Sequence, residues 1–365
     1  MKKLKWTRYF LMAVIFMPLL ATAQFTDTKE INKTYRILPE TQVEIANKYG
    51  KIEIKTWEKD SVALNIKIRV EEKKLSKLEE SIQGIDFDIT NSDHYLIVRT
   101  DVEKNKSSIS KEINRFKETL LKSDGNVQVD YTVWMPNTNR LKIENKFGDI
   151  YIGDYKGEIS INLSNGNLKA HNFDEQLDLT LNFADASINS IERGRLECNF
   201  SELFIRNANS LRINSKSTEF ELEEIQNLDA DSRRDKFRIR QIELLDARSS
   251  FSSFRINNVI DRINLRSEYG DIDINKVTPD FSLLNIESKS MDINLYFEPE
   301  TNFNFDVTNT KSEVSYGSAF KITNSEVLDE KENTKQEKGH FGKKSTDTTK
   351  LIIKANSGSL NLRSN

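Results

Sequence analysis

The segment Asn145-Lys146-Phe147-Gly148-Asp149-Ile150-Tyr151-Ile152 opens a series of similar units, and this series decides the fold. Each unit has a position where the chain is expected to bend, often occupied by a small residue, and apolar residues follow two and four places later. The bend positions fall at 148, 166, 184, 201, 218, 235, 252 and 270, with successive spacings of 18, 18, 17, 17, 17, 17 and 18 residues. A period this constant is typical of stacked repeats.

Alternation of apolar and polar residues within each unit predicts a strand with one buried face. Because the period is constant, equivalent side chains of successive units can all lie on the same face of the sheet only if the chain coils. We therefore predict an all-β fold, a single-stranded β-solenoid with rungs of 17–21 residues stacked about 4.8 Å apart. The predicted buried ladder consists of Ile150, Leu168, Leu203, Phe220, Phe237, Phe254 and Ile272.

Glycines mark several of the predicted bends, namely Gly50, Gly148, Gly166, Gly270 and Gly358. The alternative fold is an antiparallel meander of hairpins, because Ser164-Asn165-Gly166-Asn167 would suit a tight hairpin turn. Equivalent positions carry Ala184, Thr218 and Ser252, which do not suit such a turn. The sustained period favours the solenoid over the meander.

The first residues, 1–23, have the pattern of a secretion signal. A basic start precedes an apolar run of about twelve residues and the small-residue site Ala21-Thr22-Ala23. The alternative is a membrane anchor, but a spanning helix needs about 20 apolar residues. We expect cleavage before Gln24, export from the cytoplasm, and no membrane span in the mature chain.

The rest of the chain divides into four predicted regions. Residues 24–144 contain the first copy of the unit, Asn47 to Ile54, and a small helical insertion at about 71–125. Two amphipathic patterns, at 75–85 and 109–120, predict its helices. Residues 145–324 form the regular solenoid, the highly polar stretch 325–350 is predicted to be a disordered loop, and 351–365 a final rung.

The charge balance argues against binding of nucleic acid and of anionic lipid. The full chain has 54 basic and 57 acidic residues, a net charge of −3, and loss of residues 1–23 removes four basic residues to give 50 − 57 = −7. An acidic chain lacks the basic footprint of nucleic-acid-binding proteins. The single cysteine, Cys198, occupies the position of Leu163 and Leu181 in the repeat, which predicts a buried apolar role.

The sequence has no recognisable catalytic or metal-binding constellation. His94, His171 and His340 are far apart and lack metal-ligand spacing. Ser108 and Lys111 match a Ser-x-x-Lys pattern, but they stand alone in the polar insertion. We therefore expect no catalytic, cofactor-binding or metal-binding residues, no cofactor, and no enzymatic activity.

Two outward columns of side chains follow from the predicted register. The first is Asp149, Asn167, Asp185, Glu202, Glu219, Lys236, Ser253, Asp271, and the second is Tyr151, Lys169, Ser187, Phe204, Glu221, Arg238, Arg255, Asp273. Acidic and basic residues on neighbouring rungs, such as Glu221 and Arg238, are expected to pair. The alternative function is a polysaccharide lyase or glycosidase, which would use clustered carboxylates such as Asp271 and Asp273.

Two motifs carry a family resemblance. Residues 47–57, Asn-Lys-Tyr-Gly-Lys-Ile-Glu-Ile-Lys-Thr-Trp, resemble the opening motif of the bacterial putative-adhesin family. Residues 131–136, followed by 145–150, resemble its second motif, and the likeness extends loosely over 40–365. The resemblance implies an exported β-solenoid with a non-enzymatic, adhesin-like role at the cell envelope or in the periplasm. An envelope protein or polysaccharide is the expected partner, and no binding residues can be carried over.

Overall fold

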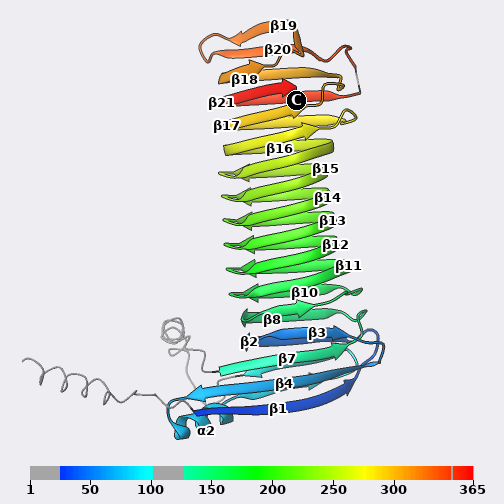
Figure 1. Cartoon of the computed structure of the whole chain (residues 1–365), viewed down its shortest axis with the longest axis vertical. Helices are drawn as coiled ribbons and strands as arrows, with labels where there is room; N and C mark the ends of the chain where they lie inside the picture. Colours follow the sequence, from blue (N-terminus) through cyan, green and yellow to red (C-terminus); the bar gives the residue numbers. More distant parts are fainter. Residues whose placement is uncertain (1–24, 102–126, 347, 365) are drawn as a thin grey trace, which may run out of the picture. The chain divides into compact units, whose positions relative to one another are not determined.

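The computed structural model describes residues 25–101, 127–346 and 348–364 (Figure 1). The predicted secretion signal and the second predicted helix, at 109–120, lie outside the described residues. The described chain divides into two compact units. One contains 25–29, 68–86, 101 and 127–128, and the other contains 30–67, 87–100 and 129–364.

The described residues form an all-β protein, as predicted, with 21 strands in one sheet. Helix α2 (Leu75–Gln83) matches the first helix predicted for the insertion. The strands before the regular region are β1 (Phe25–Arg36), β2 (Gln42–Tyr49), β3 (Ile52–Thr56), β4 (Ser61–Glu72), β5 (Asp86–Asn91), β6 (Tyr95–Asp101) and β7 (Val127–Met135).

The regular region and the C-terminal region contain the remaining strands. They are β8 (Leu141–Phe147), β9 (Ile150–Ile152), β10 (Ile159–Ser164), β11 (Asn167–Asn182), β12 (Asp185–Asn199), β13 (Glu202–Lys216), β14 (Glu219–Arg233), β15 (Lys236–Ser250), β16 (Ser253–Val277), β17 (Leu283–Phe297), β18 (Phe303–Tyr316), β19 (Phe320–Asp329), β20 (Thr334–Phe341) and β21 (Lys350–Ser364).

The strand register requires the chain to coil. Strand β13 pairs in parallel with β14 over its whole length, from Glu202 opposite Glu219 to Lys216 opposite Arg233. A straight strand of 15 residues would be about 50 Å long. Its two ends nevertheless lie beside residues of the next strand, and β14 begins only three residues after Lys216. Each strand must therefore bend back to its starting point, as Figure 1 shows for β11 to β16.

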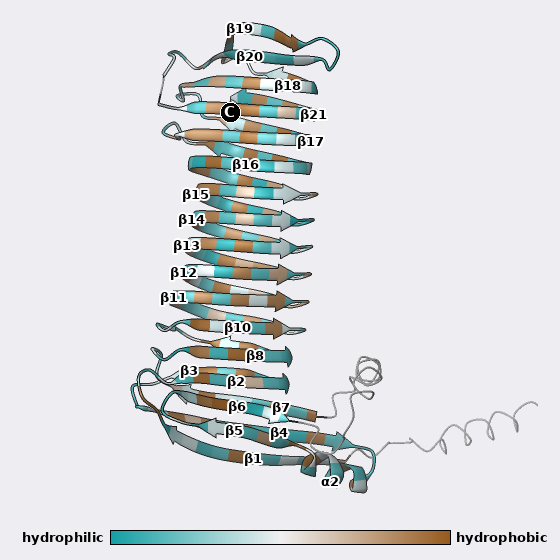
Figure 2. Cartoon of the chain, turned by 180° about the vertical axis from the view of Figure 1, so that it is seen from behind, coloured by the Kyte–Doolittle hydropathy of each residue, from teal (hydrophilic) through white to brown (hydrophobic). Residues whose placement is uncertain are grey.

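The predicted period of 17 or 18 residues equals the offset between paired residues on neighbouring strands of the sheet. Strands β11 to β15 each pair in parallel with their successor at an offset of 17 or 18 residues. Strand β10 pairs in parallel with both β8 and β11, so the antiparallel meander is excluded. Figure 2 shows hydrophobic and hydrophilic residues alternating along these strands, since alternate side chains face opposite sides.

The predicted ladder residues all lie inside, each at most 2% exposed: Ile150, Leu168, Leu203, Phe220, Phe237, Phe254 and Ile272. Register places Leu203, Phe220, Phe237 and Phe254 opposite one another on successive strands. The rings of Phe220, Phe237 and Phe254 stack with 4.7 Å between neighbouring centroids. Rung spacing and aromatic stacking distance therefore coincide, and the core is continuous from rung to rung.

The first copy of the unit stacks directly on the second, although 98 residues separate Gly50 from Gly148. Strand β2 pairs with β8, and β3 pairs with β9. Strands β6 and β7 pair in parallel with β2 and β3 and form the preceding rung.

Two predictions for the C-terminal region are wrong. Strand β21, predicted as a final rung, pairs in parallel with β17 on one side and β18 on the other. The predicted disordered loop, 325–350, contains β20 and part of β19, which form an antiparallel hairpin on β18. Polar composition misled the prediction because a hairpin at the end of a stack needs few buried residues.

The hairpin contributes a small aromatic cluster to the core. Phe341 is fully buried, and its ring stacks on that of Phe303 with 4.9 Å between centroids. Phe320 packs edge-on against both rings. These contacts cover the interior at the end of the stack.

We expect Phe237→Ala to lower the free energy of unfolding by about 3–5 kcal/mol, because it removes a ring stacked between two others. Chemical denaturation with circular dichroism measures this change. Phe251→Asn is the matched control, because Phe251 is 53% exposed. An unchanged denaturation midpoint in Phe237→Ala would contradict the buried ladder.

Candidate functional site

One residue per rung adopts a left-handed backbone conformation. We call these residues the left-handed column, with φ between 52° and 59°: Asn165, Phe183, Phe200, Ser217, Arg234, Phe251 and Tyr269. The prediction placed the bends one residue later. Gly50, Gly148 and Gly358 do have positive φ, of 115°, 151° and 96°. At Gly166 and Gly270 the preceding residue takes the left-handed conformation instead.

Close approach of the backbone explains the glycine at 166. A Cβ atom there would lie 2.2 Å from the carbonyl oxygen of Gly148, so any side chain would collide with the preceding rung. The asparagine of the repeated Asn-Lys-aromatic-Gly motif also acts at the bend. The Asn145 side-chain amide donates to the Gly50 carbonyl oxygen at 2.9 Å, which joins two rungs.

The left-handed column exposes large aromatic side chains. Phe183, Phe200, Phe251 and Tyr269 are 62%, 47%, 53% and 40% exposed. Phe183 stacks on Phe200 at 5.0 Å, and Phe251 stacks on Tyr269 at 4.9 Å. Tyr49 and Phe147, which precede the bend glycines, form a third stacked pair at 5.7 Å.

Folding does not account for these aromatic residues. A left-handed conformation costs a non-glycine residue roughly 1–2 kcal/mol, and a bulky residue there is an outlier. Asn165 and Ser217 occupy the same position in neighbouring rungs, so the bend needs no ring. An exposed apolar row that costs stability indicates a binding surface.

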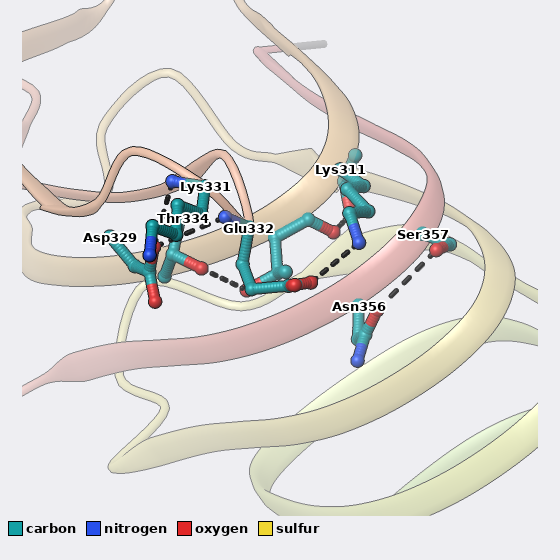
Figure 3. A network of polar contacts seen from close by, with 9 residues as sticks. Lys311, Asp329, Lys331, Glu332, Thr334, Asn356 and Ser357 are labelled. Atoms are coloured by element: carbon teal, nitrogen blue, oxygen red, sulfur yellow. Dashed lines mark hydrogen bonds and ion pairs between the residues drawn. The ribbon is translucent and has the colours of Figure 1, made fainter.

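Basic side chains adjoin the aromatic rings. The Lys216 Nζ lies 5.8 Å from the centroid of the Phe200 ring, and the Arg234 guanidinium carbon lies 6.0 Å from that of Phe251. Near the C-terminal end, Lys311 is also left-handed, with φ of 53°. Figure 3 shows that its ammonium group instead pairs with Glu332 in the β19–β20 turn, at 2.5 Å.

The inner side of the same bend holds a buried polar network centred on Asp235. Its carboxylate accepts hydrogen bonds from the Thr218 amide and the Ser215 hydroxyl, both at 2.7 Å. The Ser232 hydroxyl and the Arg233 amide also donate to it. Burial raises the pKa of the Asp235 carboxyl, and these four hydrogen bonds oppose the shift without cancelling it.

The outward columns are engaged in contacts between rungs. Glu219 pairs with Lys236 at 3.8 Å, as the register predicted. Arg238 lies opposite Glu221 in the register but pairs with Glu219. These contacts favour a structural role for the charged columns.

The two carboxylates of the alternative enzymatic hypothesis also have structural partners. Asp271 accepts a hydrogen bond from the Ser253 hydroxyl at 2.7 Å. Asp273 accepts one from the Asn294 amide at 2.6 Å and lies 3.9 Å from the Arg255 guanidinium. Both carboxylates therefore join neighbouring rungs.

Other candidate reactive groups lie apart from the left-handed column. Cys198 is fully buried, and burial raises the pKa of its thiol, so it does not present a thiolate. His171 lies at the surface with its Nδ1 2.5 Å from Asp154 Oδ1. Within residues 25–101, 127–346 and 348–364, no cluster of three or more His, Cys, Asp or Glu side chains could hold a metal. Ser108 and Lys111 lie outside these ranges.

No helix in the described part of the chain is both long and apolar enough to span a bilayer.

The fold and site define a class: an all-β protein of coiled, parallel rungs with an exposed aromatic column. A family model, Toastrack DUF4097, matches residues 40–363. The chain belongs to this family, which confirms the resemblance seen in the sequence. No curated protein matches the chain.

Solved structures of bacterial proteins are similar to the chain at low identity. A putative adhesin from Bacteroides fragilis NCTC 9343 has 11% identity and a TM-score of 0.28, with 92% of this chain and 97% of that chain covered. A putative adhesin from Parabacteroides distasonis ATCC 8503 has 9% identity and a TM-score of 0.34, with 74% and 98% covered. A putative cell adhesion protein from Clostridium sporogenes ATCC 15579 has 11% identity and a TM-score of 0.20, with 93% and 100% covered.

The Asp235 network generates a prediction for pH dependence. The pKa of Asp235 is raised in the folded protein, whereas in the unfolded chain it is about 3.9. As pH rises, the folded protein therefore keeps the Asp235 proton after the unfolded chain has lost it. The stability of the wild type relative to Asp235→Ser should therefore fall as pH rises from about 3.5 and become constant above the folded pKa. Serine is the matched replacement, because Ser201 and Ser252 occupy the equivalent position.

Urea denaturation of both proteins across this pH range measures the difference, in which contributions of other carboxyl groups cancel. A relative stability that increases with pH would mean that the hydrogen bonds outweigh burial at Asp235.

Proposed function

We propose that this protein is an exported, non-enzymatic, adhesin-like binding or scaffold protein of the bacterial cell envelope, built on a β-solenoid. In this proposal residues 1–23 are a cleaved signal peptide, and the mature chain is periplasmic or held at the envelope by a partner. An envelope protein or polysaccharide is that partner, bound at the left-handed column.

The observation that carries the proposal is the row of exposed aromatic side chains on left-handed residues. These residues cost folding energy, and the same bend tolerates small polar residues. Aromatic side chains with adjoining cations are characteristic of recognition surfaces. Aromatic side chains occur at this position in four rungs, at Phe183, Phe200, Phe251 and Tyr269, and such a row suits an extended partner better than a compact one.

The two outward columns of side chains support a non-enzymatic role. Glycoside-cleaving enzymes need two carboxyl groups held on either side of a scissile bond. The carboxylates of the outward columns that were candidates for this task, Asp271 and Asp273, instead hold neighbouring rungs together. Binding at a row of side chains requires no such pair.

We expect the protein, expressed in a Gram-negative host, to be released by osmotic shock with Gln24 as its first residue. The mature charge of −7 would not hold it on anionic lipid, which attracts basic clusters. Fractionation followed by N-terminal sequencing checks this prediction. Recovery only in detergent extracts, with residues 1–23 attached, would show that the apolar segment is an anchor.

Replacing the aromatic column should weaken retention by the envelope. The triple variant Phe200→Asn, Phe251→Asn, Tyr269→Asn should cosediment with purified envelope fragments at least tenfold less than the wild type. Its melting temperature should stay the same or rise, because asparagine tolerates the left-handed conformation. Phe204→Ala, on a wall of the coil, is the matched aromatic control. Equal sedimentation of the triple variant and the wild type would refute the column as the binding surface.

A further inference from the structure

We propose that the left-handed column contains a site for acidic glycans, formed by Lys216, Arg233 and Arg234 between the exposed rings of Phe200 and Phe251. We call these three cations the basic notch. The inference rests on the proposed function and specifies its ligand as a polysaccharide segment that carries carboxylate groups.

The register places the notch residues side by side. Lys216 lies opposite Arg233 at the ends of β13 and β14. The Ser217 amide donates to the Arg233 carbonyl oxygen at 2.9 Å, and the Arg234 amide donates to the Ser250 carbonyl oxygen at 2.9 Å. Three exposed cations therefore occupy two neighbouring rungs at one corner of the coil.

These cations differ from most arginine residues on the strands of the regular region. Those side chains pair with carboxylates of adjacent rungs, as in Arg195–Asp178, Arg206–Glu223, Arg212–Asp229, Arg248–Asp231 and Arg266–Glu287. Among the described residues, no carboxylate pairs with Lys216, Arg233 or Arg234. Asp235, which follows Arg234 in the sequence, is 1% exposed, and its carboxylate accepts hydrogen bonds on the inner side of the bend. The notch is thus an uncompensated positive site on an acidic protein.

The flanking residues complete the geometry. Phe200 and Phe251 are three rungs apart, about 14 Å at the usual strand spacing. Ser217 lies between them, and Lys216 and Arg234 lie over the rings of Phe200 and Phe251, with 5.8 and 6.0 Å from the charged groups to the ring centroids. Phe183 and Tyr269 back the two rings from the other side through stacking contacts. Ring surfaces at both ends and cations in the middle form a linear site parallel to the stacking direction.

Acidic sugars match this arrangement chemically. A pyranose ring presents apolar C–H groups that pack on aromatic rings, and its hydroxyl groups remain in water. A uronate adds a planar carboxylate, which a guanidinium group binds through two hydrogen bonds. One sugar of an extended chain is about as long as one rung is high, so successive sugars can meet successive rungs. A lipid bilayer would need a broader basic surface than three cations on one edge.

The test is a binding titration of the purified protein with oligogalacturonate and with the same oligomer methyl-esterified. Esterification keeps the sugar rings and removes the charge. We expect the free acid to bind at least tenfold more tightly than the ester, and this preference to diminish as sodium chloride is raised. Equal affinity for the acid and the ester would overturn the inference.

Two double variants locate the site. Arg233→Ser with Arg234→Ser should weaken binding of the acid at least tenfold, and both replacements occur naturally at this corner, as Ser250 and Ser217. Arg212→Ser with Arg248→Ser removes the same charge from a wall and should leave affinity within twofold. Identical losses in the two double variants would show a general charge effect and reject the notch.

Further outcomes separate this inference from the proposed function. Retention by envelope fragments without binding of oligogalacturonate would reject the acidic-glycan ligand and leave the adhesin-like function standing. Absence of both envelope retention and oligogalacturonate binding would reject the adhesin-like function as well as the acidic-glycan ligand. Binding of the notch to vesicles of anionic phospholipid, with no binding of the oligomer, would identify a lipid surface as the ligand and overturn the inference.

Discussion

The fold depends on the hydrogen bonds that hold each bend against the next rung. The Phe200 amide donates to the Lys216 carbonyl oxygen at 3.0 Å, and the Glu219 amide donates to the Ser201 carbonyl oxygen at 3.0 Å. The first contact is made by the left-handed residue itself and the second by the residue that follows it, so both hold the turn against the neighbouring rung. Because every rung turns at the same place, apolar residues meet apolar residues of the next rung, and the aromatic ladder of Phe220, Phe237 and Phe254 follows.

The same constraint determines what could be predicted from the sequence. The period and the buried ladder were predictable because register and burial repeat together, and alternation identifies the inward face. The exposed rings were not, because strict alternation from Cys198 assigns Phe200 to the interior. The left-handed residue reverses that assignment and turns the side chain outward. A large apolar residue directly before a small bend residue, repeated at 183–184, 200–201 and 269–270, is the signal that could have revealed the column.

If the proposed function holds, stability and recognition compete at the left-handed position of the rungs that carry an aromatic residue there. Asparagine and glycine fit the bend with the least strain, yet Phe183, Phe200, Phe251 and Tyr269 occupy it. Stacking between neighbours recovers part of the cost, as does the contact of Lys216 with Phe200. On the inner side of the bend, the hydrogen-bonded network around Asp235 stabilises the fold and so opposes the cost of the left-handed residues. A rigid coil with many such rungs can tolerate strain that a small domain could not.

The C-terminal end imposes an order on assembly that differs from the order of synthesis. Strand β21 lies between β17 and β18, which are joined by only five residues, and the ribosome makes β21 after both. Rungs from β8 to β17 can add one at a time as the chain emerges, but the next layer must wait for residues more than fifty positions downstream. Premature pairing of β17 with β18 would exclude β21 and trap the chain in a wrong arrangement. The C-terminal end of the stack therefore cannot be completed until β21 has been synthesised and has inserted between β17 and β18.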